Sequence, residues 1–228
     1  MVESKLIDIN SDVNEKPPYH GSGNIFSPGP YHKQRTEWIF PVPLWGFGLP
    51  DCRDINKNIE KRVYEKSKEE ETRKASNEGG WHSDGNMDDD PVIEPIIKFI
   101  EWSVRVLSIE SRMEYKDYSI FLWSNLNRPG DYNTVHDHPD CHLSGVYYVK
   151  LPKGDQPNDC GMLRFYNPMY SYNYNTDHYN PPYKQPRVEV KGKEGALLIF
   201  RAPILHDVTK NNTEEDRISL SFNIKFIR

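Results

Sequence analysis

The second half of the chain is a succession of short strand-like runs, and this feature limits the possible folds more than any other. From Tyr115 onward, runs rich in β-branched and aromatic residues alternate with Gly, Pro, Asn and Asp. The runs are SIFLWSN, DYNTVHDH, LSGVYYVK, GMLRFY, RVEV, ALLIF and RISLSFNIKFI. Many short strands separated by turns are typical of two sheets packed face to face. We therefore predict a mainly β fold, a jelly-roll-like core over residues 115–228.

Two amphipathic helices are predicted upstream, within residues 51–108. Asp51 is placed to cap the first helix, in which Ile55, Ile59 and Val63 recur every four residues. Asp90-Pro91 predicts the start of the second helix, as an N-cap followed by proline in the first turn. Each helix has an apolar stripe on one side only, so we expect both to pack outside the double sheet.

Two other segments have the composition of irregular structure. Residues 1–36 are polar and contain repeated Gly and Pro, which predicts an irregular N-terminal arm and leaves 37–228 as a single domain. Residues 167–186 form a long insertion rich in Tyr, Asn and Pro. Loops of this length are commonly functional lids, so we expect this one to overhang a binding site and help select the substrate; the alternative is a solvated insertion.

The last predicted strand, residues 217–227, separates polar from apolar side chains. Arg217, Ser219, Ser221, Asn223 and Lys225 share one face, and the residues between them are Ile, Leu or Phe. This alternation fits a strand with its polar side in water. It also fits a strand whose polar side lines a cavity inside a barrel, and the alternation alone does not separate the two.

Composition excludes some classes of protein. The chain has 228 residues with a formal net charge of −5, which argues against general nucleic-acid binding. No run approaches ~18 apolar residues, so no membrane span is expected. The first residues lack the layout of a secretory signal, and the three cysteines form no CxxC pair. A cytoplasmic protein with reduced thiols is expected, in a bacterium or an infected host cell.

A dispersed set of side chains carries the functional signal: His136, His138, His206 and Arg217. His136 and His138 are spaced i, i+2, so in an extended chain they project to the same side. His206 follows the apolar run ALLIFRAPIL, and Arg217 opens the last strand. Each residue alone has an ordinary explanation, as part of a solvated loop or as a structural histidine. Together they match a mononuclear non-haem iron site, where three protein ligands leave positions open for substrate and O₂.

Several stretches extend this signal to a family. They are FPVPLW, GGWHS, WSNLNRPGDYNTVHDHP, LSGVYYV, CGMLRFYNP, EGALLIFRAPILHDV and RISLSFN, and they cover most of residues 40–223. In this order and spacing the chain resembles the Fe(II)/2-oxoglutarate-dependent oxygenases, and within them a branch found in bacteria and phages with a prolyl-hydroxylase-like core. The resemblance implies a double-stranded β-helix, cupin-like, that holds iron in its open end.

The metal-ligand motif departs from the family pattern, which is His-x-Asp/Glu followed by a distant His. Aligning DYNTVH with the family motif puts His136 first and His138 where the carboxylate normally lies, with His206 as the distant ligand. A shift of two residues would instead make Asp140 the carboxylate ligand. We prefer the first alignment because it leaves more residues for the loop before LSGVYYV. Asp137 or Asp140 is then a candidate for accepting a ring N–H of a ligand histidine.

The resemblance also implies where 2-oxoglutarate would bind. Arg217 offers a planar fork that matches the carboxylate remote from the metal, and Ser219 completes an Arg-x-Ser pattern similar to one used in the superfamily. Tyr148 occupies a position similar to a tyrosine that contacts this carboxylate in prolyl-hydroxylase-like members, with core packing as the alternative role. Asn125 is a further candidate for lining the site.

The leading functional hypothesis is therefore a dioxygenase that hydroxylates an amino-acid side chain, a peptide or a small metabolite and releases succinate and CO₂. No nucleic acid or membrane partner is expected, and the oligomeric state is left open. One alternative is a metal-free jelly-roll binding or structural module. Another is a cupin-like metalloenzyme that does not use 2-oxoglutarate, against which the pair Arg217 and Ser219 argues.

Overall fold

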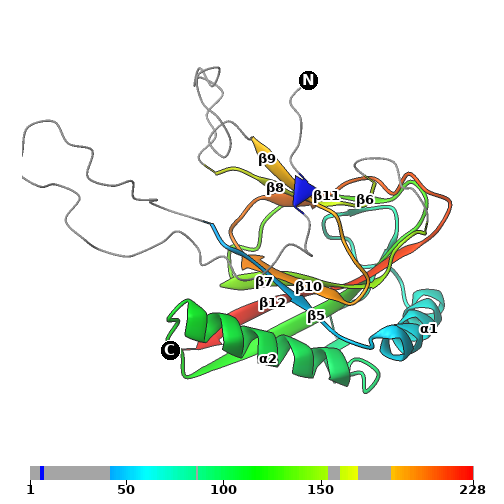
Figure 1. The fold of residues 1–228 in the computed structure, drawn as a ribbon. Coiled ribbons are helices and arrows are strands. Elements are labelled where there is room, and N and C mark those ends of the chain that lie inside the picture. The colour runs from blue at the N-terminus through cyan, green and yellow to red at the C-terminus, as the bar shows by residue number, and fades with distance from the viewer. Residues whose placement is uncertain (1–5, 8–41, 86, 154–159, 169–185, 228) are drawn as a thin grey trace, which may run out of the picture.

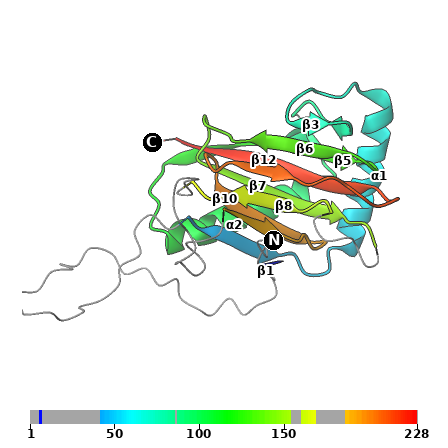
Figure 2. The same cartoon turned by 90° about the horizontal axis from the view of Figure 1, so that it is seen from above.

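Two sheets, antiparallel apart from one short parallel pair, face each other in the computed structural model, which describes residues 6–7, 42–85, 87–153, 160–168 and 186–227 (Figures 1 and 2). The first, here called the major sheet, has the strand order β2 (Leu44–Gly48), β10 (Ala196–Arg201), β7 (Leu143–Lys150), β12 (Arg217–Ile227), β5 (Asp117–Asn127) and β4 (Trp81–His82). The second, here called the minor sheet, has the order β1 (Leu6–Ile7), β9 (Arg187–Val190), β8 (Leu163–Tyr166), β11 (His206–Val208), β6 (Tyr132–His136) and β3 (Asn77–Glu78). The predicted mainly β double-sheet fold is confirmed.

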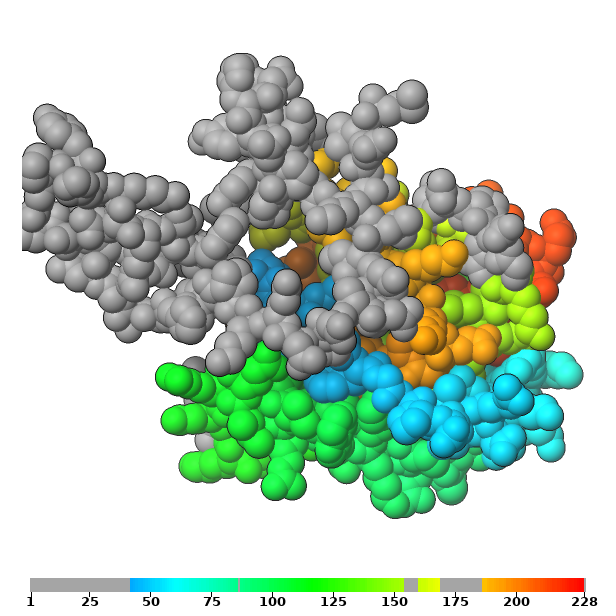
Figure 3. All heavy atoms as spheres, viewed as in Figure 1, coloured from blue at the N-terminus to red at the C-terminus, as the bar shows by residue number. Residues whose placement is uncertain are grey.

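Two helices, α1 (Arg53–Glu69) and α2 (Glu94–Glu110), cover the outer face of the major sheet and form one side of the molecule (Figures 1 and 3). The main apolar core lies between them and the sheet, because each helix turns its apolar stripe inward. Its fully buried members include Ile59, Val63, Ile100 and Val104 from the helices, and Leu197, Ile218, Leu220 and Phe222 from the strands. Asn56 also joins α1 to the sheet, donating to the Val149 carbonyl (2.8 Å) and accepting from the Tyr147 hydroxyl (2.7 Å).

The predicted helix starts were wrong by one residue for the first helix and by three for the second. The first helix has Cys52 as its N-cap, and Asp51 adopts a positive φ of 50° that belongs to the preceding turn. The second helix begins at Glu94, and a short 3₁₀ helix (Met87–Asp89) and a turn come before it. Asp90 does receive a backbone N–H, that of Val92 (3.1 Å), but its other oxygen pairs with Arg62 (2.6 Å). The carboxylate therefore caps the turn and not the helix.

The polar face of β12 points between the sheets, and this decides between the two interpretations of its alternation. Arg217 and Ser219 are 2% and 1% exposed, while Lys225 near the far end of the strand is exposed. The apolar face packs under the helices, with Ile218 and Ile224 fully buried. The strand thus has no water-facing side over most of its length, and its polar residues line an internal cavity.

The space between the sheets is divided into an apolar part and a polar part. Apolar side chains from both sheets form a second core, made of Val146, Tyr148, Leu163, Phe165, Val190, Ala196, Leu198 and Phe200. Beside it, a cavity is lined by side chains of β5, β6, β7, β11 and β12. The pairing of β11 with β6 places His206 directly opposite His136, so the fold itself brings two of the predicted ligands together.

Several predictions concern residues that the structure describes only in part. Within the expected N-terminal arm, Leu6–Ile7 form β1, which pairs in parallel with β9; the rest of residues 1–36 lies outside the described residues. So does most of the predicted lid, residues 169–185. The division into an arm and one domain over 37–228 stays a prediction. No described helix has both the length and the apolar character needed to cross a bilayer.

Candidate metal centre

Three imidazoles converge at one end of the cavity. His136 ends β6, His138 follows two residues later, and His206 opens β11 of the same sheet. Each offers one ring nitrogen, and these three atoms all lie within 4.8 Å of one another. The ring centroids are 4.3 Å apart for His136 and His206, 5.1 Å for His136 and His138, and 5.3 Å for His138 and His206. Three nitrogen donors at this spacing suit one divalent transition metal.

Backbone carbonyls orient two of these rings. His136 Nδ1 lies 2.7 Å from the Thr134 carbonyl oxygen, and His206 Nδ1 lies 2.8 Å from the Ile204 carbonyl oxygen. A carbonyl can only accept a hydrogen bond, so each Nδ1 must carry the proton. The lone pair is then on Nε2, where a metal would bind. In both cases the carbonyl belongs to the residue two positions earlier, so local chain geometry sets the tautomer.

The third ring, His138, has a side-chain partner. Its Nδ1 lies 3.3 Å from Asn223 Nδ2 on β12, and Asn223 Oδ1 lies 2.9 Å from Ser144 Oγ on β7. Asp137 and Asp140, which we expected as ring partners, are exposed. Neither belongs to the group of converging ligand atoms, so the geometry favours His138 over Asp140 at the third position.

Burial keeps the three rings neutral. It lowers the pKa of His206 to about 3 and that of His138 to about 4, and in both cases the neighbouring His136 charge lowers it further. The pKa of His136 is also lowered, again mainly by burial. At neutral pH none of the three rings therefore carries the positive charge that would oppose metal binding.

These shifts predict acid-sensitive folding of the metal-free protein. Below the ordinary histidine pKa of 6.5, the unfolded chain binds protons that the folded rings reject, so stability falls as pH falls. Each ring contributes a slope of up to about 1.4 kcal/mol per pH unit. Urea unfolding at pH 7.5 and pH 5.5 should give a lower free energy at pH 5.5, with a smaller difference in His206→Leu. Equal differences in the two proteins would contradict the assignment to His206.

At the other end of the cavity lies Arg217, whose charge has no carboxylate partner among the described residues. Its Nη1 donates to Asn127 Oδ1 (3.0 Å) and Ser219 Oγ (3.1 Å), both neutral, and its Nε has no partner there. Burial lowers the pKa of the guanidinium, yet arginine stays charged in proteins. An uncompensated buried cation is costly. Among the described residues this buried cation is therefore left without a compensating negative charge, which an anionic ligand would supply.

Tyr148 reinforces this inference. Its ring lies beside the guanidinium, with Arg217 Cζ 5.5 Å from the ring centroid. Its hydroxyl is buried and has no hydrogen-bond partner in the described part of the chain. Burial raises the pKa of this phenol, so it stays a hydrogen-bond donor. Ser219, Tyr148 and Arg217 thus present polar hydrogens that suit the carboxylate of a ligand reaching from the histidines.

Most of the predicted site residues line one cavity, and Tyr148 contacts it through Arg217. His136, His138, His206, Arg217 and Ser219 all border it, as does Asn125, whose amide donates to Ser221 Oγ (3.0 Å). Sequence reasoning missed the roles of Asn127, Asn223 and Ser144. Asn223 was visible on the polar face of the last strand, but nothing in the sequence indicated which side chain it would contact.

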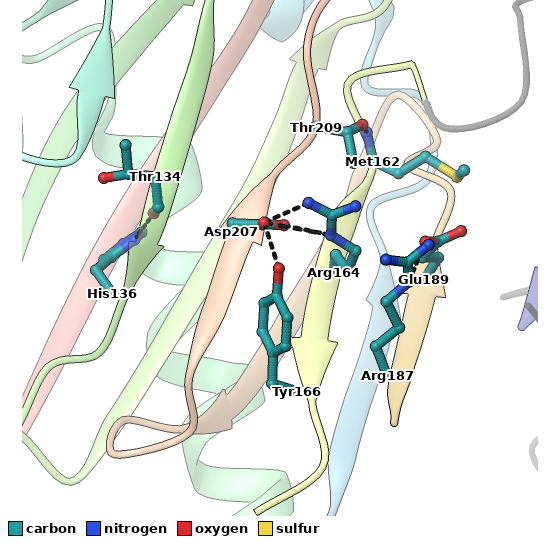
Figure 4. Close-up of polar contacts among 9 residues, drawn as sticks. All are labelled: Thr134, His136, Met162, Arg164, Tyr166, Arg187, Glu189, Asp207 and Thr209. Atoms are coloured by element: carbon teal, nitrogen blue, oxygen red, sulfur yellow. Dashed lines mark hydrogen bonds and ion pairs between the residues drawn. The ribbon is translucent and has the colours of Figure 1, made fainter. Parts of the chain in front are cut away.

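On the opposite face of the minor sheet, a polar cluster braces the strand that carries His206 (Figure 4). Asp207 is 4% exposed and accepts from Arg164 Nη2 (2.6 Å), Arg164 Nε (2.9 Å) and the Tyr166 hydroxyl (2.8 Å). Arg164 and Tyr166 belong to β8, which pairs with β11. Because neighbouring residues of a strand point to opposite faces, this cluster holds β11 while His206 faces the cavity.

Removing the two partners of this ion pair should have unequal effects. Arg164→Ala leaves the buried Asp207 carboxylate with only the Tyr166 hydroxyl, and such a loss costs about 3–5 kcal/mol. Asp207→Ala should cost less, because the Arg164 side chain is 21% exposed and can turn toward water. Urea unfolding of both variants measures the difference. A larger cost for Asp207→Ala would show that the carboxylate is not the confined partner.

A family model matches the part of the chain that holds the candidate site. It is described as "Putative 2OG-Fe(II) oxygenase" and matches residues 121–223, which include the three histidines and Arg217. No curated protein matches the chain.

Solved structures share the fold at low sequence identity. A prolyl-4-hydroxylase from Pseudomonas putida aligns with a TM-score of 0.57 and 17% identity over 81% of this chain and 92% of its own. A viral collagen prolyl hydroxylase from Paramecium Bursaria Chlorella virus-1 gives 0.55 and 11% over 81% and 96%. The non-heme α-ketoglutarate-dependent epimerase SnoN from nogalamycin biosynthesis gives 0.58 and 13% over 80% and 76%. This one fold therefore supports different reactions.

Proposed function

We propose that this chain is a 2OG-Fe(II) dioxygenase that hydroxylates an unidentified amino-acid side chain, peptide or small metabolite, and the match of a family model of these oxygenases to residues 121–223 supports this. The observation that carries the proposal is the pairing of two features in one cavity. Three neutral imidazoles converge at one end, and a buried, uncompensated guanidinium lies at the other. Iron and 2-oxoglutarate would satisfy both features: the histidines would hold the metal, and Arg217 would pair with the carboxylate of 2-oxoglutarate remote from it.

The proposed ligands are His136, His138 and His206, each neutral and oriented within the cavity. Iron and 2-oxoglutarate, when bound here, would supply the oxidation: one oxygen atom of O₂ would convert a substrate C–H to C–OH, and the other would convert 2-oxoglutarate to succinate and CO₂. Three neutral protein ligands leave the metal's charge at +2 and its remaining positions open.

Other side chains of the cavity bind, orient and exclude water. Arg217 and Ser219 would hold the far carboxylate of 2-oxoglutarate, with Tyr148 as a third donor. Charge-assisted hydrogen bonds of this kind contribute about 1.5–3 kcal/mol each. Val146, Leu163 and Phe200 form an apolar part of the cavity wall. This wall would keep water from competing for the hydrogen bonds to 2-oxoglutarate.

A row of aromatic rings, Phe121 and Trp123, leads from the surface to His138 and is our proposed contact for the substrate. Phe121 is 45% exposed and lies 5.9 Å, centroid to centroid, from Trp123, which lies 5.9 Å from His138. Trp123 is held from behind by His82, stacked at 5.6 Å. An exposed phenylalanine in line with the proposed centre provides apolar contact for a substrate while the reacting C–H lies near the metal.

The test is anaerobic reconstitution of the whole protein with Fe(II) and 2-oxoglutarate, followed by visible absorbance. The wild type should develop the metal-to-ligand charge-transfer band of a chelated 2-oxo acid, and admission of O₂ should yield succinate. A cupin-like enzyme would bind iron without the band, and a binding module would bind no stoichiometric iron. Either result in well-folded wild-type protein would overturn the proposal.

A further inference from the structure

His138 differs from the other two histidines in how its ring is held. His136 and His206 contact carbonyl oxygens, which only accept hydrogen bonds. The partner of His138 is a primary amide, which has a donor end and an acceptor end of nearly equal shape. Asn223 therefore holds the ring in either of its neutral tautomers, depending on which end faces it.

The strand register makes this contact specific. Asn223 on β12 is paired directly with Ser144 on β7, and its side chain contacts both Ser144, which lines the cavity, and His138. Ser144 Oγ lies 2.9 Å from Asn223 Oδ1 and 3.3 Å from the Phe222 carbonyl oxygen. The hydroxyl proton has two acceptors within reach, so it can turn from one to the other without losing a bond.

In the orientation that the structure shows, Asn223 Nδ2 faces His138 Nδ1 at 3.3 Å. The amide then donates, Nδ1 carries the lone pair, and the ring proton is on Nε2. A ring in this tautomer has no lone pair at Nε2 for a metal. With the amide reversed, Oδ1 accepts from Nδ1–H, and Nε2 becomes a ligand atom. The amide N–H then donates to Ser144 Oγ, whose proton turns to the Phe222 carbonyl.

We propose that Asn223 is the positioning residue of His138, and that its side-chain amide reverses on metal loading with Ser144 as the pivot. This inference rests on the proposed iron centre. Backbone carbonyls fix the tautomers of His136 and His206 before the metal binds. The tautomer of His138 is fixed by the Asn223 amide, which must first turn. The contribution of His138 to metal affinity therefore depends on the side chain of Asn223, which a substitution can change, whereas the backbone carbonyls that hold His136 and His206 remain in any variant.

Metal affinity provides the first test, with Zn(II) titrated into the metal-free full-length protein. Asn223→Leu removes the acceptor and should weaken binding about 10–100-fold. Ser144→Ala removes the pivot and should weaken it about fivefold. Asn223→Asp offers only acceptors and should bind at least as tightly as the wild type. Lys225→Met, a change at the exposed end of the same face of β12, is the control and should leave the affinity unchanged.

Ring ¹⁵N NMR provides a readout that a merely structural role would not move. In the wild type, the His138 proton should be on Nε2 without metal and on Nδ1 with Zn(II). In Asn223→Asp the His138 proton should be on Nδ1 both without and with Zn(II). This variant keeps the inference testable if Asn223→Leu does not fold. A proton on Nδ1 in the metal-free wild type, or zinc bound through Nδ1, would overturn the inference.

The titrations also separate this inference from the proposed function. If His138→Leu weakens zinc binding while Asn223→Leu and Asn223→Asp both bind like the wild type, the metal centre stands and the role of Asn223 fails. If His206→Leu and His138→Leu both leave the affinity unchanged, the metal centre itself fails, and the inference falls with it.

Discussion

His206→Leu should bind Fe(II) or Zn(II) far more weakly than the wild type and yield no succinate. The residue supplies one of the three converging nitrogens, and leucine has no lone pair to replace it. Losing only a partner of a ligand costs about 10–100-fold in affinity, so losing the ligand itself should exceed that range. The fold should survive, because His206 packs against Phe165 and Phe200 and an apolar side chain suits that contact.

His142 supplies the matched control for this prediction. It lies in the same part of the chain as His136 and His138, but its Nδ1 accepts from the Phe226 backbone N–H (3.1 Å) and it is not among the converging ligands. His142→Leu should therefore keep the metal affinity of the wild type. Isothermal titration of both variants, with circular dichroism to confirm folding, decides the matter. Comparable affinities in the two variants would remove His206 from the centre.

Arg217→Met should change function and stability in opposite directions. If the guanidinium makes two charge-assisted bonds to 2-oxoglutarate, its loss weakens binding by about 3–6 kcal/mol, or about 10²- to 10⁴-fold. The metal-free protein should be unchanged or more stable, by up to about 4 kcal/mol, because a buried charge without a carboxylate partner is replaced by apolar packing. Unsatisfied Asn127 and Ser219 groups offset part of this gain.

Lys225→Met is the corresponding control, since Lys225 lies on the same face of β12 but is exposed. It should change neither 2-oxoglutarate affinity nor stability appreciably. Affinity is measured anaerobically from the charge-transfer band, and stability by urea unfolding without metal. A strongly destabilised Arg217→Met protein would show that the guanidinium is a structural group satisfied by its neutral partners. Unchanged 2-oxoglutarate affinity would place the co-substrate elsewhere.

Local patterns predicted the strands better than the helix starts. The β12 run RISLSFNIKFI was predicted with the bounds that the structure has, because alternation over eleven residues is a strong period-two signal. The helix starts at Asp51 and Asp90 were wrong because each aspartate has a competing role. Asp51 takes up a left-handed turn, and Asp90 pairs with Arg62 across 28 residues of sequence. A cap motif describes only its own neighbours and contains no information on such a partner.

Part of the candidate site was likewise predictable from the sequence, and part was decided only by the tertiary structure. The spacing of His136 and His138, the strand ending at His206 and the Arg217-x-Ser219 pair were visible in the sequence, because residue type and spacing within one strand determine a shared face. Tertiary structure decided that the polar face of β12 points inward, that His206 pairs with His136, and that Asn223, not an aspartate, meets His138. Those contacts depend on strand order and register, which arise from burying one apolar face under two helices.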